Sequence, residues 1–345
     1  MIKMTKKRKK DMNEQSEVQK KPKKRRPRIK LAAAPPITSI QDLIEIGHSI
    51  KFYKNLDSVM LWRITPYLEE LNSLIGMKAL KDSVFCQILY YIQGLHTRNT
   101  SEEYLHTMLY GPPGSGKTSV AKIIAKIYQG LGILSKSGPF RIAYRDDFIA
   151  GYLGQTAIKT QKLLKSCIGG VLFIDEVYAL APRDSDRDSF SKEALDTLTA
   201  FLSEHKNDFC CIAAGYEKDI ETCFFAMNQG LKRRFPWIHK IVEYSALELA
   251  QIFFKMVKEA NWEVSMSIEE VAAVIKDHKR LFKHAGGDIE TFLSKCKMVH
   301  AKRVIGLDKV HKFVLTEKDI KNGIKLVKKH KKCKEADKPP PGLYM

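Results

Sequence analysis

The sequence of 345 residues predicts an α/β fold, in which a five-stranded parallel sheet is covered by helices and is followed by a smaller helical domain. Between residues 71 and 244, short apolar runs alternate with amphipathic stretches, which is typical of a parallel sheet with helices on its faces. After residue 244 the periodic runs have helical spacing only. Hydrophobic residues make up 44% of the chain and charged residues 28%, so we expect most of it to fold.

Each expected element follows from a local pattern. Short runs rich in apolar residues predict strands at 104–110, 140–144, 171–174, 209–214 and 239–242. An amphipathic run over 119–128 predicts a helix directly after the first strand. Helical spacing in the second domain predicts helices near 246–260, 268–283, 287–304 and 316–329.

Positive charge is concentrated at the two ends of the chain. Residues 1–30 hold 14 Lys or Arg and 3 acidic residues, and residues 321–345 hold 8 and 2. We therefore expect a disordered basic arm and linker over 1–36 and a flexible basic tail over 330–345. The two basic clusters of the arm fit a nuclear import signal or a nucleic-acid tether, with a merely solvated tail as the alternative. The apolar pattern of 37–68 is irregular, and we assign that segment no role.

The seven cysteines indicate a reducing compartment, because they are odd in number, form no C-x-x-C pair and mostly lie in apolar runs. The start of the chain lacks the apolar core of a signal peptide, and no uncharged apolar run approaches the roughly 20 residues of a membrane span. These features predict a soluble intracellular protein with no membrane partner. The basic arm permits the nucleus without requiring it.

A phosphate-binding motif follows the first predicted strand and begins the amphipathic helix. Its glycines allow the backbone to fold tightly, so that amide N–H groups and the helix N-terminus point at phosphate. The lysine would then reach the β- and γ-phosphates of ATP, and the threonine hydroxyl would coordinate Mg²⁺. The motif consists of Gly111, Pro112, Pro113, Gly114, Ser115, Gly116, Lys117 and Thr118.

Two carboxylates follow the third predicted strand, 171–174, where the second half of such a site is expected. Asp175 fits the Walker B aspartate that holds Mg²⁺ through water, and Glu176 fits the residue that polarises the attacking water. An acidic pair that merely caps a strand would not explain why both motifs occur together. The two motifs predict a P-loop ATPase with ATP and Mg²⁺ as its cofactors.

Further stretches narrow the type of ATPase. Five stretches resemble one family of ATPases. They are 71–77, with Ile75 and Gly76 at the place that packs on adenine, the run VLFIDEVYAL at 171–180, and the stretches 188–195, 213–216 and 228–235. Over 71–303 the chain resembles the AAA+ superfamily, and within it the group of red-type Rubisco activases and the stage V sporulation ATPase. Its lid resembles the lid of family members encoded by large DNA viruses more than the lid of the activases. The resemblance implies a large nucleotide-binding domain at 69–244 and a helical lid at 245–329.

The resemblance also implies an assembly and a mode of action. Members of the superfamily form homo-oligomeric rings, usually hexamers, in which a neighbour inserts an arginine into each ATP site. Arg234 matches that arginine by its place before Phe235, and Arg233 is the alternative. The loop residues Tyr152, Leu153 and Gly154 resemble the pore loop of members that thread polypeptides. An exposed aromatic residue beside glycine suits this task, because it grips any chain by apolar contact.

Two positions depart from the superfamily pattern. Tyr216 stands at the first sensor position, where many relatives have Asn. Glu290 stands where many members present the lid arginine of a Gly-x-x-Arg motif, and a carboxylate cannot pair with a γ-phosphate. Either the nucleotide does not close the lid in the usual way, or Arg303 or another base compensates.

The sequence is compatible with three functions. The first is a ring-shaped motor that remodels or threads an unidentified protein partner, as a chaperone does. The second is an ATPase that acts on nucleic acid, tethered through residues 1–30, which are also the expected contact with an import receptor. The third is a slow nucleotide-dependent scaffold. The viral resemblance leaves the cytoplasm or a viral factory open as compartments beside the nucleus.

Overall fold

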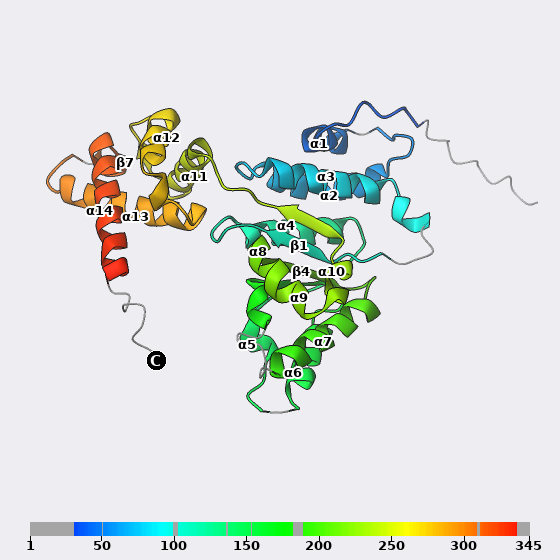
Figure 1. Ribbon diagram of the computed structural model, residues 1–345. Coiled ribbons are helices and arrows are strands. Elements are labelled where there is room, and N and C mark those ends of the chain that lie inside the picture. Colours follow the sequence, from blue (N-terminus) through cyan, green and yellow to red (C-terminus); the bar gives the residue numbers. More distant parts are fainter. Residues whose placement is uncertain are drawn as a thin grey trace, which may run out of the picture.

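The structure is a computed structural model that describes residues 31–49, 51–98, 103–135, 137–152, 154–181, 189–308 and 311–336. The predicted basic arm at 1–30 lies outside the described residues, as does the end of the predicted tail after residue 336. The described chain forms a large α/β domain with a helical lid beside it (Figure 1). No helix in these ranges is both long and apolar enough to cross a membrane.

The large domain is built on a parallel sheet of five strands, as the sequence predicts. The spatial order is β2, β3, β4, β1, β5, so β1 lies between β4 and β5. The fifth strand begins two residues earlier than predicted, because Trp237 pairs in register with Thr107 at the start of β1. The bounds are β1 (Thr107–Tyr110), β2 (Phe140–Ala143), β3 (Val171–Ile174), β4 (Cys210–Gly215) and β5 (Trp237–Lys240).

Side chains alternate between the two faces of this sheet, and both faces are buried. Leu109, Phe173 and Ile212 pack with α2, α3 and α4, whereas Met108 and Leu172 pack with α6 and α7 on the other face. The helices of the large domain are α1 (Ile40–His48), α2 (Ser58–Asn72), α3 (Lys78–Ile92), α4 (Lys117–Gly130), α5 (Arg145–Phe148), α6 (Thr156–Lys165), α7 (Ser189–Glu204), α8 (Glu217–Asp219), α9 (Phe225–Met227) and α10 (Gln229–Arg234). Single turns are η1 (Leu95–Arg98), η2 (Val177–Leu180) and the π-helical η3 (Ile220–Phe224).

The segment 37–68, which had no assigned role, contributes to the core of the large domain. Its buried side chains include Leu61, Ile64 and Leu68 of α2, which pack in the same core cluster as α4. The contact with α4 is close, because a Cβ at Gly130 would lie 2.8 Å from Ile64 Cγ2. The expected boundary between residues 68 and 69 was wrong, since α2 runs through it.

The lid is a bundle of four helices, as expected, with two short strands that the sequence did not indicate. The bounds are α11 (Ala246–Glu259), β6 (Glu263–Val264), α12 (Ile268–Asp277), η4 (Lys279–Leu281), α13 (Ala285–Arg303), β7 (Val314–Leu315) and α14 (Glu317–Ala336). Strands of two residues leave no periodic signal in a sequence. The expected tail from residue 330 was also wrong in part, because α14 continues to Ala336.

A buried ion pair joins the last two helices of the lid. Asp319 accepts hydrogen bonds from the Arg303 guanidinium at 2.8 Å and from the Thr316 backbone N–H at 2.9 Å, and it lies 3.2 Å from His300 Nδ1. Burial raises the pKa of Asp319, but the hydrogen bonds from Arg303 and Thr316 outweigh it and lower the pKa to about 2. The carboxylate therefore stabilises the fold at neutral pH, and this contribution is lost as the pH falls from about 4 toward 2.

We expect Asp319→Asn to lower the free energy of unfolding by about 3 kcal/mol, because it leaves the partly buried Arg303 without its counter-ion. Chemical denaturation followed by circular dichroism measures this. The control is Glu317→Gln on the same helix, which removes an exposed pair with Lys321 and should cost less than about 1 kcal/mol. Equal losses for the two variants would contradict a structural role for the buried pair.

Candidate active site

The phosphate-binding motif forms a tight loop between β1 and α4. Gly114 and Gly116 have φ angles of 69° and 89°, which only glycine adopts readily. α4 begins at Lys117, and no side chain caps its first turn. The Ser115 hydroxyl is buried without a hydrogen-bond partner among the described residues. A glycine-rich turn, a helix N-terminus and an unsatisfied hydroxyl in one loop fit the phosphates of ATP.

Lys117 links this loop to the end of the third strand. Its side chain is only 5% exposed, and its Nζ donates to the carbonyls of Gly111 at 3.3 Å and Pro112 at 3.2 Å. The same Nζ lies 3.5 Å from Glu176 Oε1. The lysine expected at the phosphates and the carboxylate expected at the attacking water therefore share one site.

Glu176 has an unusual backbone conformation for its side chain. Its φ of 50° is in the left-handed region, and its N–H donates to Asp175 Oδ1 at 3.1 Å. Burial raises the pKa of Glu176, Lys117 opposes this and Asp175 adds to it. A carboxylate with a raised pKa beside a buried cation suits general base chemistry. Such strain in a site residue is common where a side chain must be aimed.

Tyr216 follows β4 and joins the same site. Its ring centroid lies 6.0 Å from Lys117 Nζ. Burial raises the pKa of Tyr216, and the nearby Glu176 adds to this effect. The polar residue expected at the first sensor position is therefore next to the two groups with which it would act.

A cavity of about 540 Å³ extends from the phosphate-binding loop to the lid. Ile75 lines it, and Gly76 beside Ile75 has a φ of 64°. This positive φ favours glycine there, and a Cβ would also require the Glu248 carboxylate to move. Thr118 and Asp175, the two residues predicted at Mg²⁺, line the same cavity.

The lid lines one side of this cavity and contributes a lysine there that the sequence did not single out. Lys255 of α11 lines it beside Glu290, the carboxylate found in place of an arginine. Arg303 does not line it and instead pairs with Asp319, so the idea that Arg303 compensates was wrong. The orientation of α11 that places Lys255 at the cavity depends on the packing of the lid, which leaves no signal in a single sequence.

Tyr244 and Met77 are among the other site residues that the sequence did not single out. The Tyr244 hydroxyl donates to the Ser115 carbonyl at 2.9 Å, which ties the chain after β5 to the phosphate-binding loop. Met77 has a φ of 56° and lines the cavity, and its Cε lies 3.3 Å from the position of a Cβ at Gly116. Met77 directly follows the Ile75-Gly76 step, and this position was the signal in the sequence that could have placed it in the site.

The lid also touches the phosphate-binding loop through backbone. The Gly286 N–H donates to the Gly114 carbonyl at 3.0 Å. A Cβ at Gly114 would lie 2.2 Å from the His284 carbonyl oxygen, so any other residue there would push the lid away.

Arg234 is not in the site of its own chain. Its Nε donates to Ser203 Oγ at 2.7 Å and its Nη1 to the Gly230 carbonyl at 2.6 Å. These bonds hold the guanidinium at the end of α10, next to the exposed Arg233. Neither arginine lines the cavity around Lys117.

The loop between α5 and α6 projects into solvent. The Tyr152 side chain is 77% exposed, and a Cβ at Gly151 or Gly154 would meet nothing within 4 Å. Gly154 has a φ of 76°, which fits a sharp turn. Leu153, the middle residue of the predicted pore loop, lies outside the described residues.

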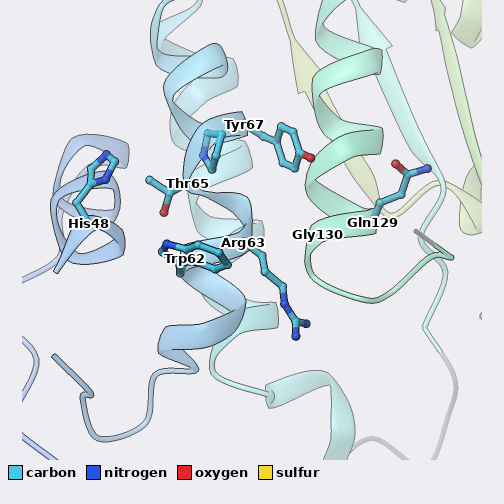
Figure 2. A pocket seen from close by; sticks show the side chains of 8 residues that line it. His48, Trp62, Arg63, Thr65, Tyr67, Gln129 and Gly130 are labelled. Atoms are coloured by element: carbon cyan, nitrogen blue, oxygen red, sulfur yellow. The ribbon is translucent and has the colours of Figure 1, made fainter. Parts of the chain in front are cut away.

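A second cavity, of about 470 Å³, lies between α1, α2 and α4 (Figure 2). Figure 2 shows His48 on α1, the ring of Tyr67 facing α4, and Trp62, which is 67% exposed. The cavity is lined by Gln129 and Gly130 at the far end of α4 from Lys117. Its described lining contains none of the predicted site residues, and we assign it no function.

Comparison with known proteins agrees with this geometry. The family described as ATPase family associated with various cellular activities (AAA) matches residues 107–229. A cfxQ-like protein of Acanthamoeba polyphaga mimivirus is 38% identical over 296 residues, which cover 83% of this chain and 71% of that protein. Stage V sporulation protein K of Bacillus subtilis is 37% identical over 209 residues, 58% of this chain and 62% of that protein.

Solved structures show the same fold. The FIGL-1 AAA domain in complex with ADP has a TM-score of 0.53 at 16% identity, covering 74% of this chain and 83% of that one. A Thermotoga maritima RuvB mutant has a TM-score of 0.52, also at 16% identity, over 74% of this chain and 72% of that one. Together with the mimivirus relative and the Walker residues gathered around Lys117, these likenesses show that the chain belongs to the AAA family and is an ATPase.

Proposed function

We propose that this ATPase works as a homo-oligomeric ring, six subunits by resemblance to its superfamily, and uses ATP to remodel or thread a protein partner. The observation that carries the proposal is Tyr152, a large aromatic side chain that is 77% exposed between two glycines with open space around them. Covering a tyrosine ring is favourable, so a partner that packs on Tyr152 would gain free energy. An unfolded polypeptide offers apolar groups of every kind to such a ring.

In this proposal the site residues divide the work of hydrolysis. Lys117 and the amides of the phosphate-binding loop bind the phosphates, and Glu176 takes the proton of the attacking water. Thr118 and Asp175 hold Mg²⁺, an ion that prefers oxygen ligands and keeps several waters. Their shared lining of the nucleotide cavity supports this assignment. Mg²⁺ neutralises phosphate charge when bound.

Arg234 completes the site of the neighbouring subunit in this proposal. Its absence from the cavity of its own chain supports action across an interface, and the bonds to Ser203 and Gly230 hold its guanidinium at one place. A cation delivered to the γ-phosphate by a neighbour makes hydrolysis depend on assembly.

The basic arm is proposed to contact an anionic partner, either nucleic acid or an import receptor. Its 14 basic residues within the first 30 support this, because lysine and arginine release counter-ions from a phosphate backbone. Deletion of residues 1–30 is expected to abolish salt-sensitive DNA binding and to leave ATPase activity intact. Stimulation of the ATPase by DNA after this deletion would favour the nucleic-acid alternative over the peptide motor.

We expect Glu176→Gln to lower ATP turnover at least about 100-fold while ATP binding persists, because glutamine cannot accept the proton. Phosphate release measures turnover, and isothermal titration calorimetry measures binding. The control is Glu204→Gln, an exposed residue on α7, which should leave turnover within about twofold. Turnover near the wild-type rate in Glu176→Gln would exclude the assigned base.

Mixing two inactive variants tests the shared site. We expect Arg234→Ala and Glu176→Gln each to be inactive, and their mixture to recover about a quarter of the wild-type rate, because one interface type in four then holds both residues. Phosphate release across mixing ratios, with sedimentation in ATP, measures this. A mixture that stays inactive would contradict action in trans, and inactivity of Arg233→Ala with an active Arg234→Ala would reassign the role to Arg233.

Replacement of Tyr152 should uncouple the ATPase from polypeptide. We expect casein, an unfolded chain, to stimulate wild-type turnover, and Tyr152→Ala to lose this stimulation while basal turnover changes less than about twofold. Tyr152→Phe should keep it, because the ring remains. The control is Trp62→Ala, another exposed aromatic at the second cavity. Equal stimulation of wild type and Tyr152→Ala would refute the gripping role.

A further inference from the structure

A third cavity, of about 510 Å³, lies where the lid meets the first half of the phosphate-binding loop. Pro112, Pro113 and Tyr216 line it from the large domain, and residues 279–280 and 282–285 line it from the lid. Tyr244 lines both this cavity and the nucleotide cavity. The large-domain wall thus includes the residue expected to sense the γ-phosphate, and Pro112, whose carbonyl accepts from Lys117.

Three cations of the lid line this cavity. They are Lys279, Arg280 and Lys283, and all three are exposed. Within the described residues, no side-chain hydrogen bond or ion pair engages them. Glu243 is the carboxylate that shares the described lining with them. The lid therefore presents an excess of positive charge beside Tyr216.

The segment that carries these cations is held in place from both sides. Phe282, between Arg280 and Lys283, is buried in the lid core with its ring 5.6 Å from that of Phe292. Lys331 Nζ donates to the Leu281 carbonyl at 2.5 Å and to Asp288 Oδ1 at 2.9 Å.

The other carboxylate oxygen of Asp288 connects these hydrogen bonds to the segment that contacts the phosphate-binding loop. Asp288 Oδ2 accepts the His284 N–H at 2.7 Å, and the His284 carbonyl is the group that packs on Gly114. The cationic segment is thus fixed relative to the lid core and to the phosphate-binding loop.

We propose that Lys279, Arg280 and Lys283 bind the terminal phosphate of ATP and let the lid distinguish ATP from ADP, the task for which Glu290 has the wrong charge. Lys283 directly precedes His284, whose carbonyl packs on Gly114. Glu290 lines the nucleotide cavity, where a carboxylate repels phosphate, and Lys255 shares that lining, whereas Lys279, Arg280 and Lys283 line the cavity beside Tyr216. Lys331 and Asp288 are positioning residues. The proposal concerns one subunit and does not depend on ring formation or on protein remodelling.

The test is the ratio of ATP affinity to ADP affinity, measured by isothermal titration calorimetry with Mg²⁺ on the full chain. All proteins carry Glu176→Gln so that ATP persists. Adding K279A, R280A and K283A together should weaken ATP binding at least about tenfold, because charge-assisted hydrogen bonds to phosphate are lost. ADP binding should change less than about threefold, since ADP lacks the terminal phosphate.

Three further variants make the result specific. Lys276→Ala removes an exposed lysine of α12 that does not line the cavity, and it should leave both affinities unchanged. Lys283→Arg keeps the charge and should keep the ATP preference. Lys331→Met should lower ATP affinity with little effect on ADP, because it frees the Leu281 carbonyl and Asp288. Equal weakening of ATP and ADP by the triple variant, or an unchanged ratio with normal circular dichroism, would overturn the proposal.

Discussion

The site depends on the parallel register of three neighbouring strands. β1 lies beside β4 and β4 beside β3, with Tyr110 opposite Gly215 and Ile174 opposite Ala213. The strands therefore end at one edge of the sheet, and the segments that leave them meet there. These segments are the phosphate-binding loop after β1, the carboxylate pair after β3 and Tyr216 after β4. The backbone hydrogen bonds of the sheet therefore set the distances between these three segments.

A second constraint joins this edge to the lid. The lid backbone at residues 284–286 packs on Gly114 so closely that a Cβ is excluded, and Tyr244 bonds the Ser115 carbonyl. Any movement of the lid must therefore act on the phosphate-binding loop. The lid in turn is held by buried polar bonds around Asp319 and by Lys331 at Asp288. Removing one partner of such a buried pair leaves the other charge without its counter-ion, which is why these bonds resist rearrangement of the lid helices.

Much of the fold could be predicted from the sequence, because its signals are local. The five strands, α4 and the four lid helices follow from apolar periodicity, and the phosphate-binding loop from a contiguous motif. The segment 37–68 was harder. The core face of α2 is spaced helically at Leu61, Ile64 and Leu68, but Pro66 and the exposed Trp62 interrupt the pattern. The packing role of Gly130 becomes clear only in the structure, where Ile64 lies against it.

The sequence by itself determined the chemistry, because Lys117, Thr118, Asp175 and Glu176 lie in short motifs whose spacing survives without a structure. The tertiary structure decided which distant residues share the site. It placed Lys255 and Glu290 in the nucleotide cavity and directed Arg303 to Asp319 instead. It also gathered three lid cations beside Tyr216. The reason is physical. The sequence of a turn fixes its backbone geometry locally, whereas the residues that a helix face contacts depend on how distant segments pack.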